Sequence, residues 1–271
     1  MFANPWIAAL IALFIWWFST GAILWVVKGA DGRGRDGHLW SVLLGLPLLL
    51  GGVFGMATSF ADPSVAGAYL AFFSALAIWG WIEIAFLSGI ITGPNRYTCP
   101  IGTPPWERFI RAWGTIAYHE ILLVTVLGLM LWLARDAANA FAAWTFAVLF
   151  LARISAKLNL FFGVPRINIE FLPEPLAHLP SHFRTAKLNP VFPISVTALT
   201  FAVACWLERL YVSATPGEIV GFALLTSLTA LALLEHWLMV LPLPDAKLWR
   251  WMIPAPKTTP KRLLREDGHG L

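Results

Sequence analysis

Charge is scarce in this sequence. Only 13% of the 271 residues are charged, whereas 58% are hydrophobic, and the mean hydropathy is +0.71. Soluble domains carry about 25% charged residues, and one core cannot hide this much apolar surface from water. The composition therefore excludes an ordinary soluble protein and predicts an all-α integral membrane protein with the lipid bilayer as its main partner.

Cysteine and cleavable targeting signals are also lacking. The two cysteines, Cys99 and Cys205, lie far apart in the sequence, so neither a disulfide framework nor a cysteine-based metal site is expected. The N-terminus has no basic segment and no small-residue cleavage motif before its first apolar run. We expect that run to be kept as a membrane helix.

What the sequence does contain is a series of long apolar runs. A bilayer core about 30 Å thick needs about 20 residues of helix. Seven runs meet this length, at 6–27, 39–60, 65–91, 112–134, 137–162, 193–212 and 219–241. They predict a bundle of seven transmembrane helices over residues 1–243, followed by a basic cytoplasmic tail at 244–271.

Lysine and arginine are distributed unevenly around these runs. They follow the first, third and fifth runs and recur in the tail, whereas only Arg135 and Arg209 fall on the other side. Basic loops stay on the cytoplasmic side of a membrane, so we expect the N-terminus outside and the C-terminus inside. The basic residues form no single patch despite a net charge of +4, so no nucleic-acid partner is expected.

Several ionisable or polar residues fall inside the predicted spans, where each is costly and suggests function. Counting about 1.5 Å per residue from the cytoplasmic end of each span puts them all in one leaflet. Two more histidines follow in the loop after the fifth run. The predicted polar cluster consists of Glu83, His119, Glu120, Arg153, Lys157, Asn159, Glu235 and His236, and the loop adds His178 and His182.

One interpretation of this cluster is a metal site. Imidazole and carboxylate groups suit iron or zinc, and the candidate ligands are His119, His178, His182 and His236 with nearby carboxylates. His178 and His182 are spaced to share one helix face, but Pro180 between them weakens that geometry.

Two other interpretations stay open. The carboxylates can pair with Arg153 and Lys157 while the histidines form hydrogen bonds across the bundle. Alternatively, His119 can bind the central metal of a haem or chlorophyll. The run at 219–241 has no lysine, which excludes a retinal Schiff base there.

Five runs carry a family resemblance. WWFSTGAILW (16–25), FLSGIITGPNRYTCP (86–100), RFIRAWGTIAYHE (108–120), ARISAKLNLFFGVPRINIEFLPEPLAHLPSHF (152–183) and NPVFP (189–193) resemble the PuhE-type photosynthetic complex assembly proteins of purple phototrophic bacteria. The genes of that family lie beside reaction-centre genes. The resemblance implies a multi-pass protein of the bacterial inner membrane, with reaction-centre, light-harvesting or bacteriochlorophyll-biosynthesis proteins as partners.

The resemblance implies no catalytic residues, so three functions remain in view. The first is a factor that supports assembly of the reaction centre and its light-harvesting complex, or bacteriochlorophyll supply, with at most transient bacteriochlorophyll binding. The second is a membrane metalloenzyme that acts on a tetrapyrrole or lipid-like substrate at the polar cluster. The third is a pigment-binding accessory subunit.

Overall fold

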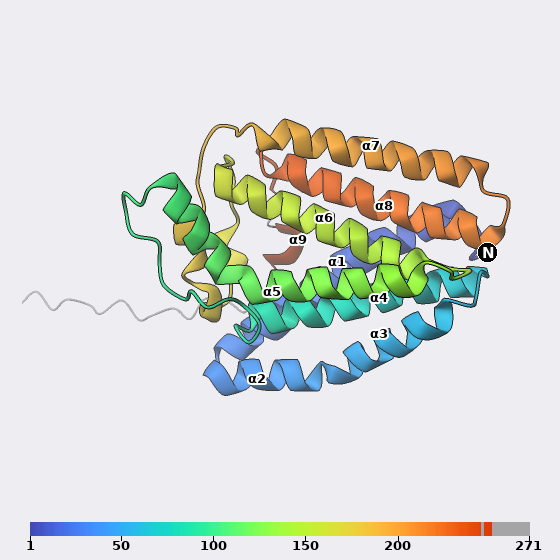
Figure 1. Ribbon diagram of the computed structural model, residues 1–271, viewed down its shortest axis with the longest axis horizontal. Helices are drawn as coiled ribbons and strands as arrows, with labels where there is room; N and C mark the ends of the chain where they lie inside the picture. Colours follow the sequence, from blue (N-terminus) through green and yellow to red (C-terminus); the bar gives the residue numbers. More distant parts are fainter. Residues whose placement is uncertain (245–246, 251–271) are drawn as a thin grey trace, which may run out of the picture.

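The protein is described by a computed structural model that covers residues 1–244 and 247–250. This part of the chain is all-helical, apart from one isolated β-bridge between Val164 and Thr185 (Figure 1). The α-helices are α1 (Pro5–Asp31), α2 (Gly34–Leu44), α3 (Leu46–Ser59), α4 (Val65–Leu87), α5 (Pro105–Ala134), α6 (Phe141–Phe162), α7 (Val191–Val212), α8 (Pro216–Leu238) and α9 (Lys247–Arg250). Three 3₁₀ turns lie between α6 and α7: η1 (Ile169–Phe171), η2 (Glu174–Leu176) and η3 (Leu179–His182).

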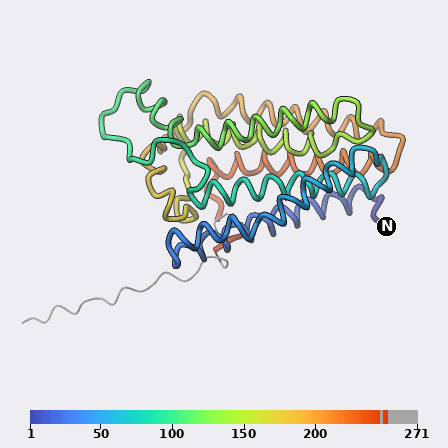
Figure 2. The backbone as a smooth tube through the Cα atoms, turned by 60° about the horizontal axis from the view of Figure 1, so that its bottom comes forward, coloured from blue at the N-terminus to red at the C-terminus, as the bar shows by residue number. Residues whose placement is uncertain are grey.

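Seven helical segments are long and apolar enough to cross a membrane, when α2 and α3 are taken together as Gly34–Ser59. This confirms the predicted number of helices that are long and apolar enough to span a membrane. The long helices alternate in direction, as the two views show (Figures 1 and 2). The short connections 60–64, 135–140 and 213–215 lie at the end of the bundle that holds the N-terminus, and the long connections 88–104 and 163–190 lie at the opposite end, here called the loop end.

The second predicted span, 39–60, is not one helix. The structure begins it earlier, at Gly34, and divides it into α2 and α3 at Gly45. Pro47 lies in the first turn of α3 and has no N–H to donate back into α2. The helix therefore breaks just before the proline, and the two halves bend where they meet (Figure 1).

The other predicted boundaries move by a few residues, and three of the shifts have a visible local cause. The third span ends at Leu87, before Gly89, whose φ of 73° stops a helix. The fourth begins at Pro105, because its first turns are amphipathic and fall outside a purely apolar window. The fifth begins at Phe141, whose N–H bonds to the side chain of Asn139 at 3.0 Å.

The core of the bundle is built around α4 and α8. In the most apolar 18-residue stretch of each helix, 67% of the residues of α4 and 56% of those of α8 are buried, compared with 17% in α1 and in α7. Small residues line the contacts between α1, α4 and α8, among them Ala8, Ala12, Ala68 and Ala223. Small side chains let helix backbones approach closely, as is usual between membrane helices. Polar groups on α4 and α8 are therefore held in the interior.

Helix α5 is bent near its middle, and the turn after α4 lies against the bend (Figure 1). The carbonyl oxygen of Thr92 accepts a hydrogen bond from the His119 N–H at 3.0 Å, and that of Gly114 accepts one from the Asn95 N–H at 2.9 Å. The Asn95 side chain also donates to the Arg111 carbonyl oxygen at 2.9 Å. In a straight helix these α5 groups would bond within the helix, so the turn takes over bonds that the bend leaves open.

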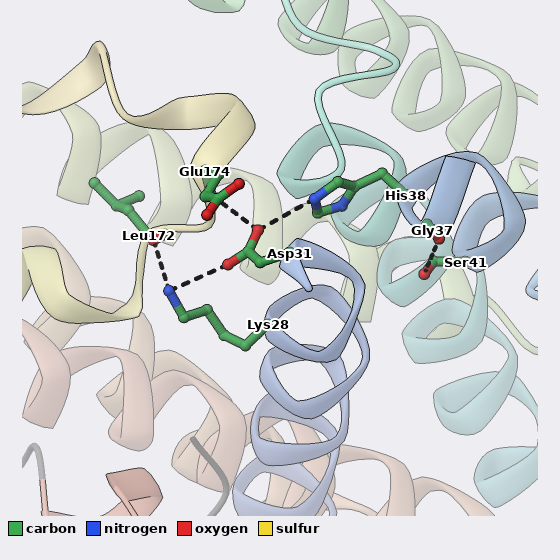
Figure 3. A network of polar contacts seen from close by, with 7 residues as sticks. All are labelled: Lys28, Asp31, Gly37, His38, Ser41, Leu172 and Glu174. Carbon is green, nitrogen blue, oxygen red and sulfur yellow. Dashed lines mark hydrogen bonds and ion pairs between the residues drawn. The ribbon is translucent and has the colours of Figure 1, made fainter. Parts of the chain in front are cut away.

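The connection 163–190 folds back onto the loop end and is tied to α1 and α2 (Figure 3). Asp31 lies at the centre of this contact. Its carboxylate pairs with Lys28 at 3.3 Å and His38 at 3.1 Å, and accepts a bond from the Glu174 N–H at 3.0 Å. Lys28 also donates to the Leu172 carbonyl oxygen at 3.1 Å. The connection is therefore an ordered layer over this end of the bundle.

The segment assigned to the basic tail begins with contacts to the bundle. Trp249 of α9 is buried, and its indole N–H donates to the Trp17 carbonyl oxygen at 3.3 Å. Arg250 pairs with Glu170 at 3.1 Å. Residues 245–246 and 251–271, which hold the other basic residues of the predicted tail, lie outside the described residues.

Candidate functional site

Two ion pairs cross the interior of the bundle. The Glu83 carboxylate on α4 pairs with the Arg153 guanidinium on α6 at 2.7 Å. The Glu120 carboxylate on α5 pairs with the Lys157 ammonium, also on α6. Arg153 and Lys157 are one helical turn apart and so project from the same face of α6. These four residues together with His119 are called the ionic cluster below.

His119 lies between the two pairs and is fully buried. Its Nε2 is 3.7 Å from a Glu83 carboxylate oxygen, which is too long for a hydrogen bond. Its ring packs against Phe86, with 4.3 Å between the ring centroids. The backbone bond to Thr92 holds this part of α5 in place, so the turn after α4 helps to set the position of the imidazole.

Several buried polar atoms of the ionic cluster have no hydrogen-bond partner among the described residues. Neither ring nitrogen of His119 has a hydrogen-bond partner among the described residues, and the same holds for one carboxylate oxygen each of Glu83 and Glu120 and for Nε of Arg153. An unpaired buried polar group costs about 1–3 kcal/mol. The cluster therefore has the means to bind a further polar group.

His236 and Glu235 belong to other contacts. The Ala232 carbonyl oxygen lies 2.8 Å from His236 Nδ1, and the Ser155 hydroxyl lies 2.8 Å from Nε2. A carbonyl only accepts, so Nδ1 carries the proton and Nε2 accepts from Ser155. Glu235 accepts a bond from the Trp16 indole N–H at 2.9 Å. Both residues therefore join α8 to neighbouring helices.

Asn159 joins α6 to the start of α7. Its side-chain amide donates to the Ser195 hydroxyl at 2.9 Å, and its side-chain oxygen accepts from Asn189 at 3.1 Å. Asn189 also donates to the Gly163 carbonyl oxygen at 2.7 Å. The structure thus places Asn159 in a hydrogen-bond network that holds α6 and α7 together, and none of the bonds of its side chain is to a residue of the ionic cluster.

His178 and His182 lie in the connection 163–190. They do not share one face of an α-helix, because the short 3₁₀ turn η3 at Leu179–His182 replaces it. Pro180 lies in the first turn of η3, a position that tolerates proline because the N–H there would have no partner within the helix. Burial lowers the pKa of His178 from its usual value of 6.5, with added repulsion from His182 and Arg96. Burial also lowers the pKa of His182.

The geometry does not assemble the predicted metal site. Within residues 1–244 and 247–250, no group of three or more histidine, cysteine, aspartate or glutamate side chains is placed to hold a metal ion. His119 is in the ionic cluster, His236 bonds to Ser155 and Ala232, and the other two candidates lie in the loop. In this conformation these residues do not fit an iron or zinc centre.

A tetrapyrrole bound through His119 also lacks space beside the imidazole. His119 lines neither of the two cavities that adjoin Arg153. Phe86 packs against one face of its ring. Axial ligation would need the imidazole to face an open volume the size of a macrocycle, so this group would fit only after a rearrangement of α4 or α5.

Two cavities lie on either side of Arg153. The first, of about 310 Å³, is enclosed by the end of α4, the first half of α5, α6 and the connection 163–190. The second, of about 350 Å³, lies between α1, α4, α6 and α8 and is lined by Glu83 and Glu235 among others. Arg153, Ala156, Asn168, Leu172 and Leu87 line both. The first is called the α5–α6 cavity and the second the central cavity.

The sequence did not single out several residues that shape this region. Asp31 and His38 anchor the loop end, while Trp16, Ser155 and Asn189 bind predicted site residues. The stretch around Asp31 and His38 is rich in glycine and charged residues. Such a composition predicts an ordinary turn and gives no sign that the two side chains bind each other. A tryptophan or serine in an apolar helix gives no signal of its partner, because the partner lies on another helix.

Comparisons with known proteins cover nearly the whole chain. The family described as "Protein of unknown function (DUF3623)" matches residues 2–260. A protein of Rhodobacter capsulatus described as "Uncharacterized 30.4 kDa protein in puhA 5'region" is 59% identical over 252 residues, which are 93% of this chain and 92% of the relative. No solved structure matches the chain significantly. The matched range includes every residue of the ionic cluster.

Proposed function

This chain belongs to the DUF3623 family, and we propose that it is a multi-pass membrane factor that supports assembly of the bacterial photosynthetic reaction centre and light-harvesting complex, or the supply of bacteriochlorophyll to them. The observation that carries the proposal is the relative at 59% identity, whose description places it in the puhA 5′ region. That region belongs to a photosynthesis gene cluster. The likeness of five sequence runs to PuhE-type assembly proteins supports the same role.

The proposed site of action is the bacterial inner membrane, with the N-terminus outside and the loop end in the cytoplasm. The uneven distribution of basic residues supports this orientation. Of the basic residues in the described chain, Arg135 and Arg209 lie toward the N-terminal end of the bundle, and the long connections at the loop end carry many of the others. Because successive helices alternate in direction, an N-terminus outside the cytoplasm is consistent with a loop end inside it.

The proposed partners are membrane helices of the photosynthetic apparatus or of bacteriochlorophyll biosynthesis. The least buried helices offer apolar surface for such contacts, because only 17% of the most apolar stretch of α1 and of α7 is buried. Large exposed side chains on them include Trp6, Phe14, Trp25, Phe201 and Tyr211. Lipid and partner helices both fit this surface, while the ordered loop end can bind cytoplasmic partners.

Affinity purification during active assembly tests the proposal. A tagged copy is expressed in a phototrophic bacterium that lacks the native gene, and complexes are isolated from mild detergent as photosynthetic growth begins. We expect reaction-centre, light-harvesting or pigment-biosynthesis proteins to copurify with it. An equally expressed seven-span membrane protein with the same tag is the control. Equal recovery of these proteins with both baits would refute the proposal.

The second proposal is a metal-dependent enzyme or pigment-binding subunit. It requires a rearrangement of α4 or α5, because the described residues provide no three-ligand metal site and Phe86 packs on the His119 ring. The observation that favours it is His119. Both of its buried ring nitrogens lack partners among the described residues. Elemental analysis and an absorption spectrum of the purified protein, repeated for His119→Ala, test this idea. Stoichiometric iron or zinc, or tetrapyrrole absorbance, that disappears in the variant would support it, whereas a colourless and metal-free protein would end it.

A further inference from the structure

The α5–α6 cavity has an apolar wall and a cationic corner. Its wall is formed by side chains such as Phe109, Ile116, Ile154, Phe161 and Leu179. Of the lining residues in the described chain, Arg153 and Lys157 alone carry a full charge, and no aspartate or glutamate lines it. Ligand pockets of about 300–1,000 Å³ combine an apolar lining with a few polar groups in this way. The cavity is therefore suited to a molecule with an apolar body and one anionic group.

Arg153 has hydrogen-bonding capacity beyond its pair with Glu83. One terminal nitrogen binds the Glu83 carboxylate at 2.7 Å. Nε is buried and has no hydrogen-bond partner among the described residues, so a ligand would reach the guanidinium through its exposed part. The side chain stays 39% exposed although its partner is 7% exposed, so it faces the cavities. A guanidinium carries five N–H donors in a fixed plane that matches carboxylate and phosphate oxygens. A second anion can therefore bind beside Glu83.

The two cavities differ in charge, which sets the class of ligand. Glu83 and Glu235 line the central cavity but not the α5–α6 cavity. An anionic group would face two carboxylates on the central side, whereas on the α5–α6 side it would face Arg153 and Lys157, whose carboxylate partners Glu83 and Glu120 do not line the cavity. Leu172, Leu179 and Phe183 of the connection 163–190 close the cavity toward the loop end, and an ion pair strengthens where water is excluded.

We propose that the α5–α6 cavity binds a single-chain amphiphile, with its carboxylate or phosphate headgroup against Arg153 and Lys157 and its apolar chain between α5 and α6. The headgroup chemistry is shared by free fatty acids and by lipid phosphates. This binding function is independent of the proposed role in assembly, because it depends only on the shape and charge of the cavity.

Fluorescence quenching tests the proposal on the detergent-purified full chain. Trp113 lines the cavity and is 46% exposed, so a brominated chain bound there should quench its fluorescence. The probes are dibromostearate, dibromostearyl phosphate and the uncharged dibromostearyl alcohol. We expect saturable quenching by one or both anions that unbrominated stearate reverses and Trp113→Phe largely removes. The anion that binds identifies the source, and equal quenching by the alcohol would overturn the proposal.

Two variants separate the charge of the site from its volume. Glu83→Gln with Arg153→Gln removes the cationic donor without leaving Glu83 unpaired, and Ala156→Phe fills the wall shared by the two cavities. Each should weaken anion binding by roughly tenfold or more. Arg135→Gln, at the opposite end of the bundle and paired with Asp136, should leave binding unchanged. Unchanged binding in Ala156→Phe would contradict the assigned site.

A measurement on the unaltered protein guards against variants that do not fold. Stearate should raise the Tm of the wild-type protein in detergent in a saturable way, and stearyl alcohol at the same concentration should not, because only the anion binds the folded cavity through Arg153. An equal shift with both compounds would overturn the proposal without any substitution.

Discussion

Charged side chains in the interior of this bundle are stabilised in pairs. Glu120 is 1% exposed, so its carboxylate is almost fully removed from solvent. Its partner Lys157 also lies over the Phe86 ring, 5.3 Å from the centroid. The attraction between the two charges offsets their loss of hydration only while both members of the pair are present. Removing one member is therefore worse than removing both.

This predicts a specific pattern of stability. Lys157→Met leaves Glu120 as a buried charge and should lower the free energy of unfolding by about 3–5 kcal/mol. The double variant Lys157→Met with Glu120→Gln should recover most of that loss. Denaturant unfolding in detergent measures both.

Arg135→Met is the matched control for this experiment, since Arg135 is exposed and pairs with Asp136 at the protein surface. Its effect should stay within about 1 kcal/mol. If the double variant is as unstable as Lys157→Met alone, Glu120 and Lys157 do not stabilise each other.

Single residues show where prediction from the sequence stops. Hydropathy alone identifies Glu83, Glu120 and His236 as unusual, because ionisable groups are rare in apolar helices. It does not identify their partners. His236 bonds to Ser155 and Asn159 to Asn189, and these partners depend on helix rotations that one sequence does not reveal. The predicted cluster is therefore divided among several networks.

The bend in α5 depends on the turn that follows α4. Gly93 lies so close to the bent helix that a Cβ atom there would be 2.1 Å from the Gly114 carbonyl oxygen and 2.8 Å from the Thr115 carbonyl carbon. Both are backbone atoms and cannot turn away. The glycine is thus needed for close approach, and the approach in turn places His119 beside Glu83.

Gly93→Ala should therefore destabilise the protein by about 1–3 kcal/mol. Gly128→Ala on α5 is the control, because no described atom outside the backbone of its own helix turn lies within 4 Å of its added Cβ, and it should be neutral or stabilise by up to about 1 kcal/mol. Thermal unfolding of both variants in detergent gives the comparison. A harmless Gly93→Ala would show that the turn does not pack into the bend.

The loop histidines make the connection 163–190 sensitive to pH. Burial holds the pKa of His178 and His182 below the usual 6.5, and the cations Arg96, Arg108 and Arg111 oppose a further positive charge. A histidine with a lowered pKa stabilises the folded loop above its unfolded pKa, and this contribution is lost as the pH falls through about 6.5 toward the folded value.

Hydrogen exchange over residues 176–185 should therefore become faster when the pH is lowered from about 7.5 to about 5.5, after correction for the intrinsic exchange rate. The double variant His178→Gln with His182→Gln should lose most of this change. The same acceleration in the variant would show that the sensitivity to pH does not come from His178 and His182.

The sequence predicted the membrane-length helices better than their breaks and ends. Apolar length identifies each span, but Pro47 alone does not show whether α2 and α3 separate or merely bend, since proline is tolerated in membrane helices. The start of α5 at Pro105 was missed because its first turns carry charge. Amphipathic ends and breaks depend on packing at the loop end more than on hydropathy.

The topology of the whole molecule can be tested with its own cysteines. Cys99 lies in the connection 88–104 at the loop end, and Cys205 is exposed on α7. If the loop end is cytoplasmic, a membrane-impermeant maleimide should label Cys99 in inverted vesicles and not in intact spheroplasts. Ala214→Cys, in the connection 213–215, should give the opposite result. Labelling of Cys99 in intact spheroplasts would reverse the orientation.

For the whole bundle, the sequence predicted the number of spans but not their arrangement. All seven spans have similar mean hydropathies, between 1.5 and 2.1. Yet α4 and α8 are the most buried of these helices, while α1 and α7 are the least buried. Lipid and protein interiors are equally apolar, so hydropathy does not distinguish a central helix from an outer one. The cavities beside Arg153 follow from this arrangement and were not predicted.

The most direct test of the proposed function is deletion of the gene in a phototrophic bacterium, followed by near-infrared absorbance of its membranes. The proposal predicts less assembled reaction centre and light-harvesting complex, restored by a plasmid copy. Solvent-extracted bacteriochlorophyll that falls in proportion would indicate pigment supply, and pigment that persists outside the complexes would indicate assembly. Unchanged absorbance of the assembled complexes throughout the onset of phototrophic growth would contradict the proposal.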